Sequence, residues 1–235
     1  MKKENPKKRG AWFWTKRIFL FLFLAQLFYI IILKWVDPPI TFTQLGSVFR
    51  GDGLKRDYVS GSELSPNIKL AVMASEDQLF PDHDGFDWKS INKAMQNNEK
   101  KKARIKGAST ISQQTAKNVF LWQGRSWIRK GFEMYFTKMI EWIWGKKRIL
   151  EVYLNVIEMG RGIYGAEAAS QAYFKKSARQ LSRREAAMIA ACLPNPKTFT
   201  VKPLSRYVAG RCGWVQLQMQ ALDGDPDIQN LIRNK

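Results

Sequence analysis

The chain has 235 residues, of which 45% are hydrophobic, enough for one folded core, and its length gives no reason to split it into several domains. Lysine and arginine number 39 against 20 acidic residues, so the net charge is +19 and favours an anionic partner: nucleic acid, anionic lipid or a phosphorylated substrate. The chain has only two cysteines and one histidine, without the spacing of zinc ligands, which argues against a structural zinc site. It contains no G-x-x-x-x-G-K-[ST] motif, so the sequence gives no support for nucleotide chemistry.

The N-terminal 17 residues are strongly basic and precede an apolar segment. Residues 18–33 are apolar except for Gln26, and a helix extended to Val36 would measure about 28 Å at roughly 1.5 Å per residue, close to the ~30 Å of a bilayer core. We therefore predict a basic cytoplasmic tail over residues 1–17 and a transmembrane anchor over residues 18–36, with the N-terminus inside. A cleaved signal peptide is the alternative, but Lys34–Pro39 offers no small-x-small cleavage site.

Residues 37–64 are predicted to form an irregular linker and domain entry, because two prolines end the span and glycines recur in a polar stretch. Ser65-Pro66 then predicts a helix start, with serine as N-cap and proline at the first helical position. That helix ends at Glu76, where the stretch Glu76–Asp87 places five more ionisable residues beside two phenylalanines. A partly apolar wall raises a carboxylate's pKa, which suits general acid/base work. An ordinary acidic surface loop is the alternative.

The middle of the chain predicts a mobile basic loop over Glu99–Gly107 and then two helices. Ser109 is predicted to cap a short helix, Thr110–Asn118, on which Gln113 and Lys117 share a face. Ser126 is predicted to start a longer helix that runs to Trp144, and this helix is apolar nearly all round with interleaved basic residues. Such a helix is either buried in the core or lies in the lipid head-group layer, and we favour the second interpretation.

Arg129 and Glu133 are four residues apart on this helix, with Lys130 beside them. By spacing alone they form an ordinary surface ion pair, worth about 0–1 kcal/mol. Further helices are predicted over residues 146–156, 166–174, 183–193 and 204–222, so the domain is mainly α-helical. We expect Cys192 to be a free buried thiol, although a disulfide with Cys212 is the alternative.

Six sequence blocks in this order resemble the peptidoglycan glycosyltransferases that polymerise lipid II. The blocks lie at residues 76–87, 107–121 (G-A-S-T-I-S-Q-Q-T-A-K-N-V-F-L), 129–133 (R-K-G-F-E), 147–155 (K-R-I-L-E-V-Y-L-N), 160–167 (G-R-G-I-Y-G-A-E) and 191–196 (A-C-L-P-N-P). The resemblance implies a lysozyme-like, all-helical glycosyltransferase domain over residues 65–235. The chain ends without room for a transpeptidase domain, so it looks like the monofunctional form.

The resemblance also implies a reaction and roles for individual residues. The 4-hydroxyl of lipid II attacks the lipid-linked end of the nascent glycan strand, which inverts the anomeric centre and releases polyprenyl pyrophosphate. Glu76 matches the catalytic base and Glu133 the second essential carboxylate, which orients basic groups or holds a divalent cation (Mg or Mn). The implied substrate-binding residues are Lys117, Arg125, Arg129, Lys130, Ser109, Gln113, Gln114, Asp77, Phe80 and His83.

The implied setting is the bacterial cytoplasmic (inner) membrane, with the catalytic domain outside. Expected partners are lipid II, the nascent glycan strand, membrane lipid and other cell-wall synthesis proteins, and neither nucleotide nor nucleic acid is expected. Two alternatives from other classes stay open. One is a membrane-tethered basic protein that binds nucleic acid or anionic lipid, and the other is a lysozyme-like peptidoglycan hydrolase.

Overall fold

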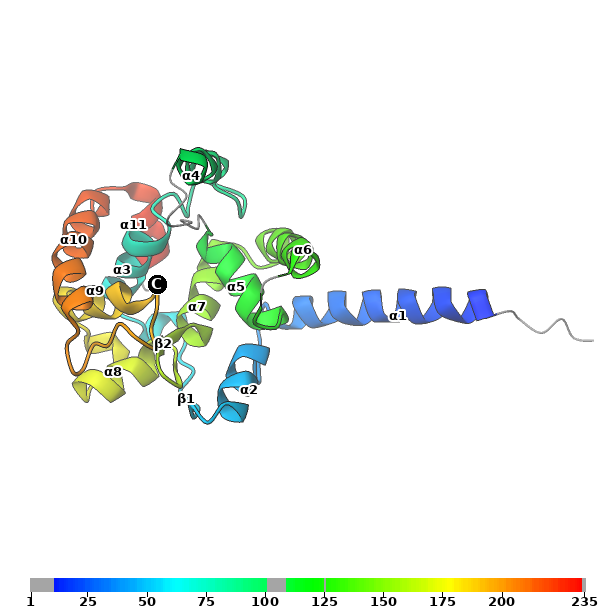
Figure 1. Ribbon diagram of the computed structural model, residues 1–235, viewed down its shortest axis with the longest axis horizontal. Coiled ribbons are helices and arrows are strands. Elements are labelled where there is room, and N and C mark those ends of the chain that lie inside the picture. Colours follow the sequence, from blue (N-terminus) through cyan, green and yellow to red (C-terminus); the bar gives the residue numbers. More distant parts are fainter. Residues whose placement is uncertain (1–10, 101–108, 125, 234–235) are drawn as a thin grey trace, which may run out of the picture. The chain divides into compact units, whose positions relative to one another are not determined.

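The computed structural model of the chain describes residues 11–100, 109–124 and 126–233 (Figure 1). The chain divides into two compact units, Met1–Val36 and Asp37–Lys235. The second unit is mainly α-helical, as predicted, and contains one small sheet that the all-helical expectation omitted.

The first unit contains helix α1, Ala11–Ile32, which is long and apolar enough over residues 12–32 to cross a membrane. At about 1.5 Å per residue its 22 residues extend about 33 Å. The helix begins and ends earlier than the predicted span of 18–36. Beyond Ile32 the chain forms tighter turns, in which the Lys34 and Trp35 amides donate to carbonyls three residues back.

The second unit begins with α2 (Phe42–Phe49), so the prediction of an irregular linker is wrong at this point. A capping box fixes the helix start: the Gln44 amide donates to the Thr41 hydroxyl, and the Thr41 amide donates to Gln44 Oε1. The remaining elements are β1 (Lys55–Arg56), η1 (Gly61–Glu63), α3 (Pro66–Glu76), α4 (Trp88–Lys100), α5 (Ile111–Phe120), α6 (Trp127–Ile143), α7 (Lys146–Val156), β2 (Glu158–Gly160), β3 (Ile163–Tyr164), α8 (Ala166–Phe174), η2 (Ala178–Gln180), α9 (Arg183–Cys192), α10 (Arg206–Leu222) and α11 (Pro226–Ile232).

Two groups of helices form most of the core of the second unit. α3 packs against α9 and α10, and α5 packs against α6 and α7 (Figure 1). The α3 segment Ile68–Ala74 is buried throughout, as are Ile149, Leu150, Tyr153 and Leu154 of α7. The end of α3 therefore lies where the two groups meet, and the Glu76 side chain reaches across to α5.

The small sheet joins the beginning of this unit to its middle. β3 pairs parallel with β1, placing Ile163 opposite Lys55, and antiparallel with β2. Gly162, at φ +67°, lets the backbones approach closely, because a Cβ there would lie 2.1 Å from the Asp52 carbonyl oxygen. A side chain at position 162 is therefore incompatible with this pairing.

The predicted helix at 127–144 is not a fully buried core helix. Trp127, Ile128 and Trp142 of α6 are 92%, 71% and 83% exposed, whereas Glu133, Thr137 and Ile140 are buried.

The predicted ends of α7 and α8 are confirmed, whereas α5 is capped by Thr110 rather than Ser109. Cys192 and Cys212 are free, buried thiols, as expected for Cys192.

Candidate active site

Glu76 is the last residue of α3 and is only partly buried. Ser65 caps the start of this helix by accepting from the Asn67 amide, so the helix begins where the sequence predicts and delivers Glu76 at its far end. Gln114 Nε2 of α5 donates to Glu76 Oε2 at 2.9 Å. Burial raises the pKa of Glu76, while the hydrogen bonds from Gln114 and Ser75 oppose that rise. A carboxylate with a raised pKa and an accessible face can accept a proton.

Asp77 connects the end of α3 to the start of α5. Its buried carboxylate accepts from the Ile111 amide at 2.9 Å and from His83 Nε2 at 3.1 Å. The Gly85 amide donates to His83 Nδ1, so a neutral His83 carries its proton on Nε2 and donates it to Asp77. Phe80 is fully buried beneath the Lys146 ammonium, 4.6 Å from its ring centre. These three residues hold the loop after Glu76; their predicted contact with substrate stays a prediction.

α5 presents its polar face to a cleft of about 380 Å³. The cleft is lined by Thr43, Arg50, Gln114, Lys117, Asn118, Gln123, Ile157, Glu158, Leu193, Pro196 and Lys197. Gln113 is buried and completes the Thr110 capping box, so its carboxamide oxygen is held by the Thr110 amide at 3.0 Å. Gln114 and Lys117 are therefore the two predicted substrate-binding residues that the structure places on this cleft.

Lys117 lies in the electrostatic field of two carboxylates and two other cations. Burial lowers the pKa of the Lys117 ammonium, and the nearby carboxylates of Glu133 and Glu76 oppose this effect, whereas Arg129 and Lys130 add to it. The structure thus brings residues of α3, α5 and α6 together, although Glu76 and Glu133 are 57 positions apart in the sequence. An anion placed beside Lys117 would stabilise its charged form.

Glu133 holds the two cations that precede it on α6. Arg129 donates to Glu133 Oε2 at 2.8 Å and Lys130 to Oε1 at 2.5 Å, and Glu133 is 3% exposed. The surface-pair interpretation is therefore wrong for Arg129 and Glu133, whose side chains are only 12% and 4% exposed. Removing one partner of such a buried pair costs about 3–5 kcal/mol. Arg129 Nε is buried and has no hydrogen-bond partner within the described part of the chain, so this donor is free to bind an anion.

The residues around Glu133 do not fit a divalent cation. Both of its carboxylate oxygens accept from cationic side chains, so a divalent cation, even one completed by water and substrate phosphates, would have to displace Arg129 or Lys130. Among residues 11–100, 109–124 and 126–233, no group of three or more His, Cys, Asp or Glu side chains is arranged to hold a metal ion. The donor set at Glu133 is that of a structural anchor for basic groups.

Three further cations near the cleft were not identified from the sequence. Arg50 and Lys197 line it, and both pair with Asp52, at 3.4 and 2.5 Å. Arg211 of α10 acts on Glu76 by its charge, and its Nε is another buried donor without a partner in the described residues. The A-C-L-P-N-P block directly precedes Lys197 and could have pointed to this residue from the sequence, whereas no neighbouring motif points to Arg211.

For two further predicted residues, Arg125 and Ser109, the structure gives no contact with the cleft among the residues that it describes. Arg125 is outside the residues that the structure describes, so its predicted contact with pyrophosphate stays a prediction. Ser109 is exposed and immediately precedes the Thr110 cap.

Residues 160–165 also match G-x-G-x-x-G. In dinucleotide-binding folds this pattern opens a helix directly after a parallel strand. Here Gly160 ends β2 and Gly162 lies in the turn to the antiparallel β3, so the motif makes a hairpin. The expectation of no nucleotide cofactor therefore stays a prediction, and this motif does not argue against it.

Comparisons with known proteins agree with this geometry. Residues 43–220 match the family model described as Transglycosylase. A biosynthetic peptidoglycan transglycosylase of Escherichia coli is 57% identical over 173 residues, which cover 74% of this chain and 72% of the relative. One of Yersinia pseudotuberculosis is 48% identical over 225 residues, 93% of each chain. The match includes every element from α3 to α9.

Proposed function

The chain belongs to the Transglycosylase family, and from this premise we propose that it is a peptidoglycan glycosyltransferase that polymerises lipid II into β-1,4-linked glycan strands. The observation that carries the proposal is the position of Glu76, a partly buried carboxylate of raised pKa beside a cleft lined by Lys117. Polymerisation needs a base for a sugar hydroxyl and cations for a departing pyrophosphate, and these groups supply both.

Glu76 acts as the general base in this proposal. Its carboxylate takes the proton from the 4-hydroxyl of the acceptor sugar as that oxygen attacks the anomeric carbon of the donor. The bond from the anomeric carbon to the pyrophosphate oxygen breaks, and attack from the opposite side inverts the configuration. Gln114 holds Glu76 Oε2 at 2.9 Å, whereas Ser75 Oγ donates to Oε1 only at 3.5 Å, so Oε1 is the oxygen more easily turned to the hydroxyl. A base of this kind contributes about 10²–10⁴-fold to the rate.

The cations of α5 and α6 stabilise the leaving group. Lys117 and the free Arg129 Nε provide donors for the negative charge that develops on the pyrophosphate. Glu133 acts through Arg129 and Lys130, since it holds both in place and touches them rather than the sugar. Arg125 adds to this group by the family resemblance. No step in this mechanism passes through a metal ion.

We place the protein in the bacterial inner membrane, with α1 as its anchor, the N-terminus in the cytoplasm and the domain outside. The apolar stretch of α1 and the basic residues before it support this orientation. The exposed Trp127, Ile128 and Trp142 of α6 support contact of this helix with the lipid head-group layer, where the polyprenyl substrate resides.

The decisive experiment is polymerisation by the purified full chain in detergent, with labelled lipid II and products separated on a gel. The proposal predicts long glycan strands that still carry lipid at one end. Release of soluble muropeptides from purified sacculi would identify a hydrolase instead, since a hydrolase uses water as acceptor. Binding of nucleic acid or anionic vesicles without polymer formation would identify a non-enzymatic binder.

A further inference from the structure

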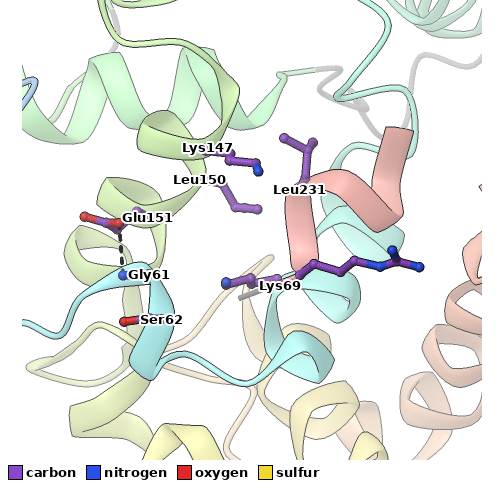
Figure 2. Close-up of a pocket in the computed structure, with 8 residues that line it drawn as sticks. Gly61, Ser62, Lys69, Lys147, Leu150, Glu151 and Leu231 are labelled. Atoms are coloured by element: carbon purple, nitrogen blue, oxygen red, sulfur yellow. Dashed lines mark hydrogen bonds between the residues drawn. The ribbon is translucent and has the colours of Figure 1, made fainter. Parts of the chain in front are cut away.

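A second pocket lies between α3, α7, η1 and α11 and has a volume of about 200 Å³. Figure 2 shows Lys69 of α3 and Lys147 of α7 directed into it, with Leu150 and Leu231 forming apolar walls. The remaining lining residues are Gly61, Ser62, Glu151 and Arg233. None of these residues lines the cleft that contains Lys117. Lys69 precedes Glu76 by seven residues, about 10 Å along α3.

The charges around this pocket do not balance. Three cations line it, Lys69, Lys147 and Arg233, against the single carboxylate of Glu151. That carboxylate accepts from the Gly61 amide at 2.9 Å (Figure 2). It is also paired with Arg148, which lies outside the lining of the pocket. The interior of the pocket is therefore electropositive, because Arg148, which pairs with both Glu151 and Asp37, offsets the charge of the one lining carboxylate.

Lys69 is the most unusual member of this group, because it is only 6% exposed. Its ammonium donates to the Ile232 carbonyl at 3.5 Å, the long limit for such a bond. Burial lowers the pKa of Lys69, Glu151 opposes this effect and Lys147 adds to it. A buried ammonium is costly to desolvate, so an anion beside Lys69 would offset part of that cost, and the exposed Lys147 ammonium, which donates to Asn230 Oδ1 at 3.2 Å, adds a second positive charge.

We propose that this pocket, the Lys69 pocket, is a binding site for a single phosphate group. A dianionic phosphate matches three cations better than a monoanionic carboxylate does, and its several oxygens can accept from the Lys69 and Lys147 ammonium groups together. The leucine walls suit the carbon chain of a phosphate monoester. Such a ligand would connect α11 to α3 and α7, the helix that carries Lys147, and so fasten the C-terminal helix to the core.

The test is titration of the full chain in non-ionic detergent with inorganic phosphate, followed by phosphorus NMR, at constant ionic strength in chloride. Because the active-site cations can also bind phosphate, the titration uses the Lys117→Met variant as its background. In that background we expect saturable binding that weakens at least tenfold on adding Lys69→Met or Lys147→Gln. Lys55→Gln, which removes one exposed positive charge elsewhere, should leave the affinity unchanged.

Two arms identify the source of the phosphate. Tighter binding of glycerol phosphate than of inorganic phosphate would indicate a phosphate ester such as a lipid head group, and the reverse would indicate the free ion; either supports the site. Absence of saturable binding, or equal losses in Lys147→Gln and Lys55→Gln, would overturn it. Failure here leaves the polymerisation assay untouched, so this inference and the proposed function can fail separately.

Discussion

The hydrogen bond from Gln114 to Glu76 gives the sharpest test of the proposed base. In Gln114→Met the carboxylate keeps its burial and loses its nearest donor, at 2.9 Å. Hydrogen bonds to charged groups are worth about 1.5–3 kcal/mol. At about 1.36 kcal/mol per pKa unit, the pKa of Glu76 should rise by about one to two units.

The assay is the pH dependence of kcat/KM for lipid II polymerisation. A general base works only when deprotonated, so activity increases as pH rises through the pKa of Glu76. The acidic limb of the profile should therefore move to higher pH in Gln114→Met, by about one to two units. Any contact of Gln114 with substrate lowers the plateau as well, but it does not move the limb.

Gln123→Met is the matched control, because Gln123 lines the same cleft and donates to Thr43 rather than to Glu76. Its acidic limb should coincide with that of the wild type. Gln114→Met also removes the acceptor of the buried Tyr153 hydroxyl, so we expect a loss of about 1–3 kcal/mol in unfolding free energy. A folded Gln114→Met protein with an unshifted limb would refute the assignment of Glu76 as base.

Four further outcomes follow from the same structure. Glu76→Gln should lower polymerisation about 10²–10⁴-fold. The same substitution should raise the melting temperature at neutral pH, because burial raises the folded-state pKa of Glu76 and so makes its charged form destabilising. In acid the wild-type carboxylate is already neutral, and the melting temperature should not rise. Lys117→Ala should lower activity about ten- to a hundredfold, whereas Lys55→Gln should not, and equal losses would indicate a diffuse charge effect. Trp142→Ser should remove a component of fluorescence that lipid-phase quenchers reach in proteoliposomes; unchanged quenching would contradict contact of α6 with lipid. Alkaline phosphatase fused after Lys235 should be active in cells, and an inactive fusion would overturn the proposed orientation.

Local signals in the sequence located most of the helices. Ser65-Pro66 marks the start of α3, and Ser182 with Glu185 forms a capping box at the start of α9, the helix predicted over residues 183–193. These signals succeed because cap and helix are neighbours in the chain, so the hydrogen bonds depend on few residues. The start of α2 carries the same kind of signal at Thr41 and Gln44, and it was hidden by the glycines that follow.

The parts that sequence analysis missed depend on contacts between distant residues. β1 has two residues and exists only because β3 pairs with it. Gln113 completes the cap of α5, whereas its neighbour Gln114 lines the cleft. The two differ only in the direction in which α5 points their side chains, and that direction is set by how the helix packs. Arg211 reaches the neighbourhood of Glu76 through the packing of α10 on α3, which no local pattern encodes.

The parallel pairing of β1 with β3 also sets the order in which the domain can fold. Val59 is held by the Asn155 side chain across 96 positions, and β1 finds its partner strand later still. At about 5–20 residues per second, synthesis delays these partners by about 5–20 s. Until Tyr164 has been added, the α2–β1 segment has its own capping box but no sheet to join. The nascent chain therefore passes through a period in which β1 is synthesised but unpaired, and closure of this long loop is slow because its contacts are distant in sequence.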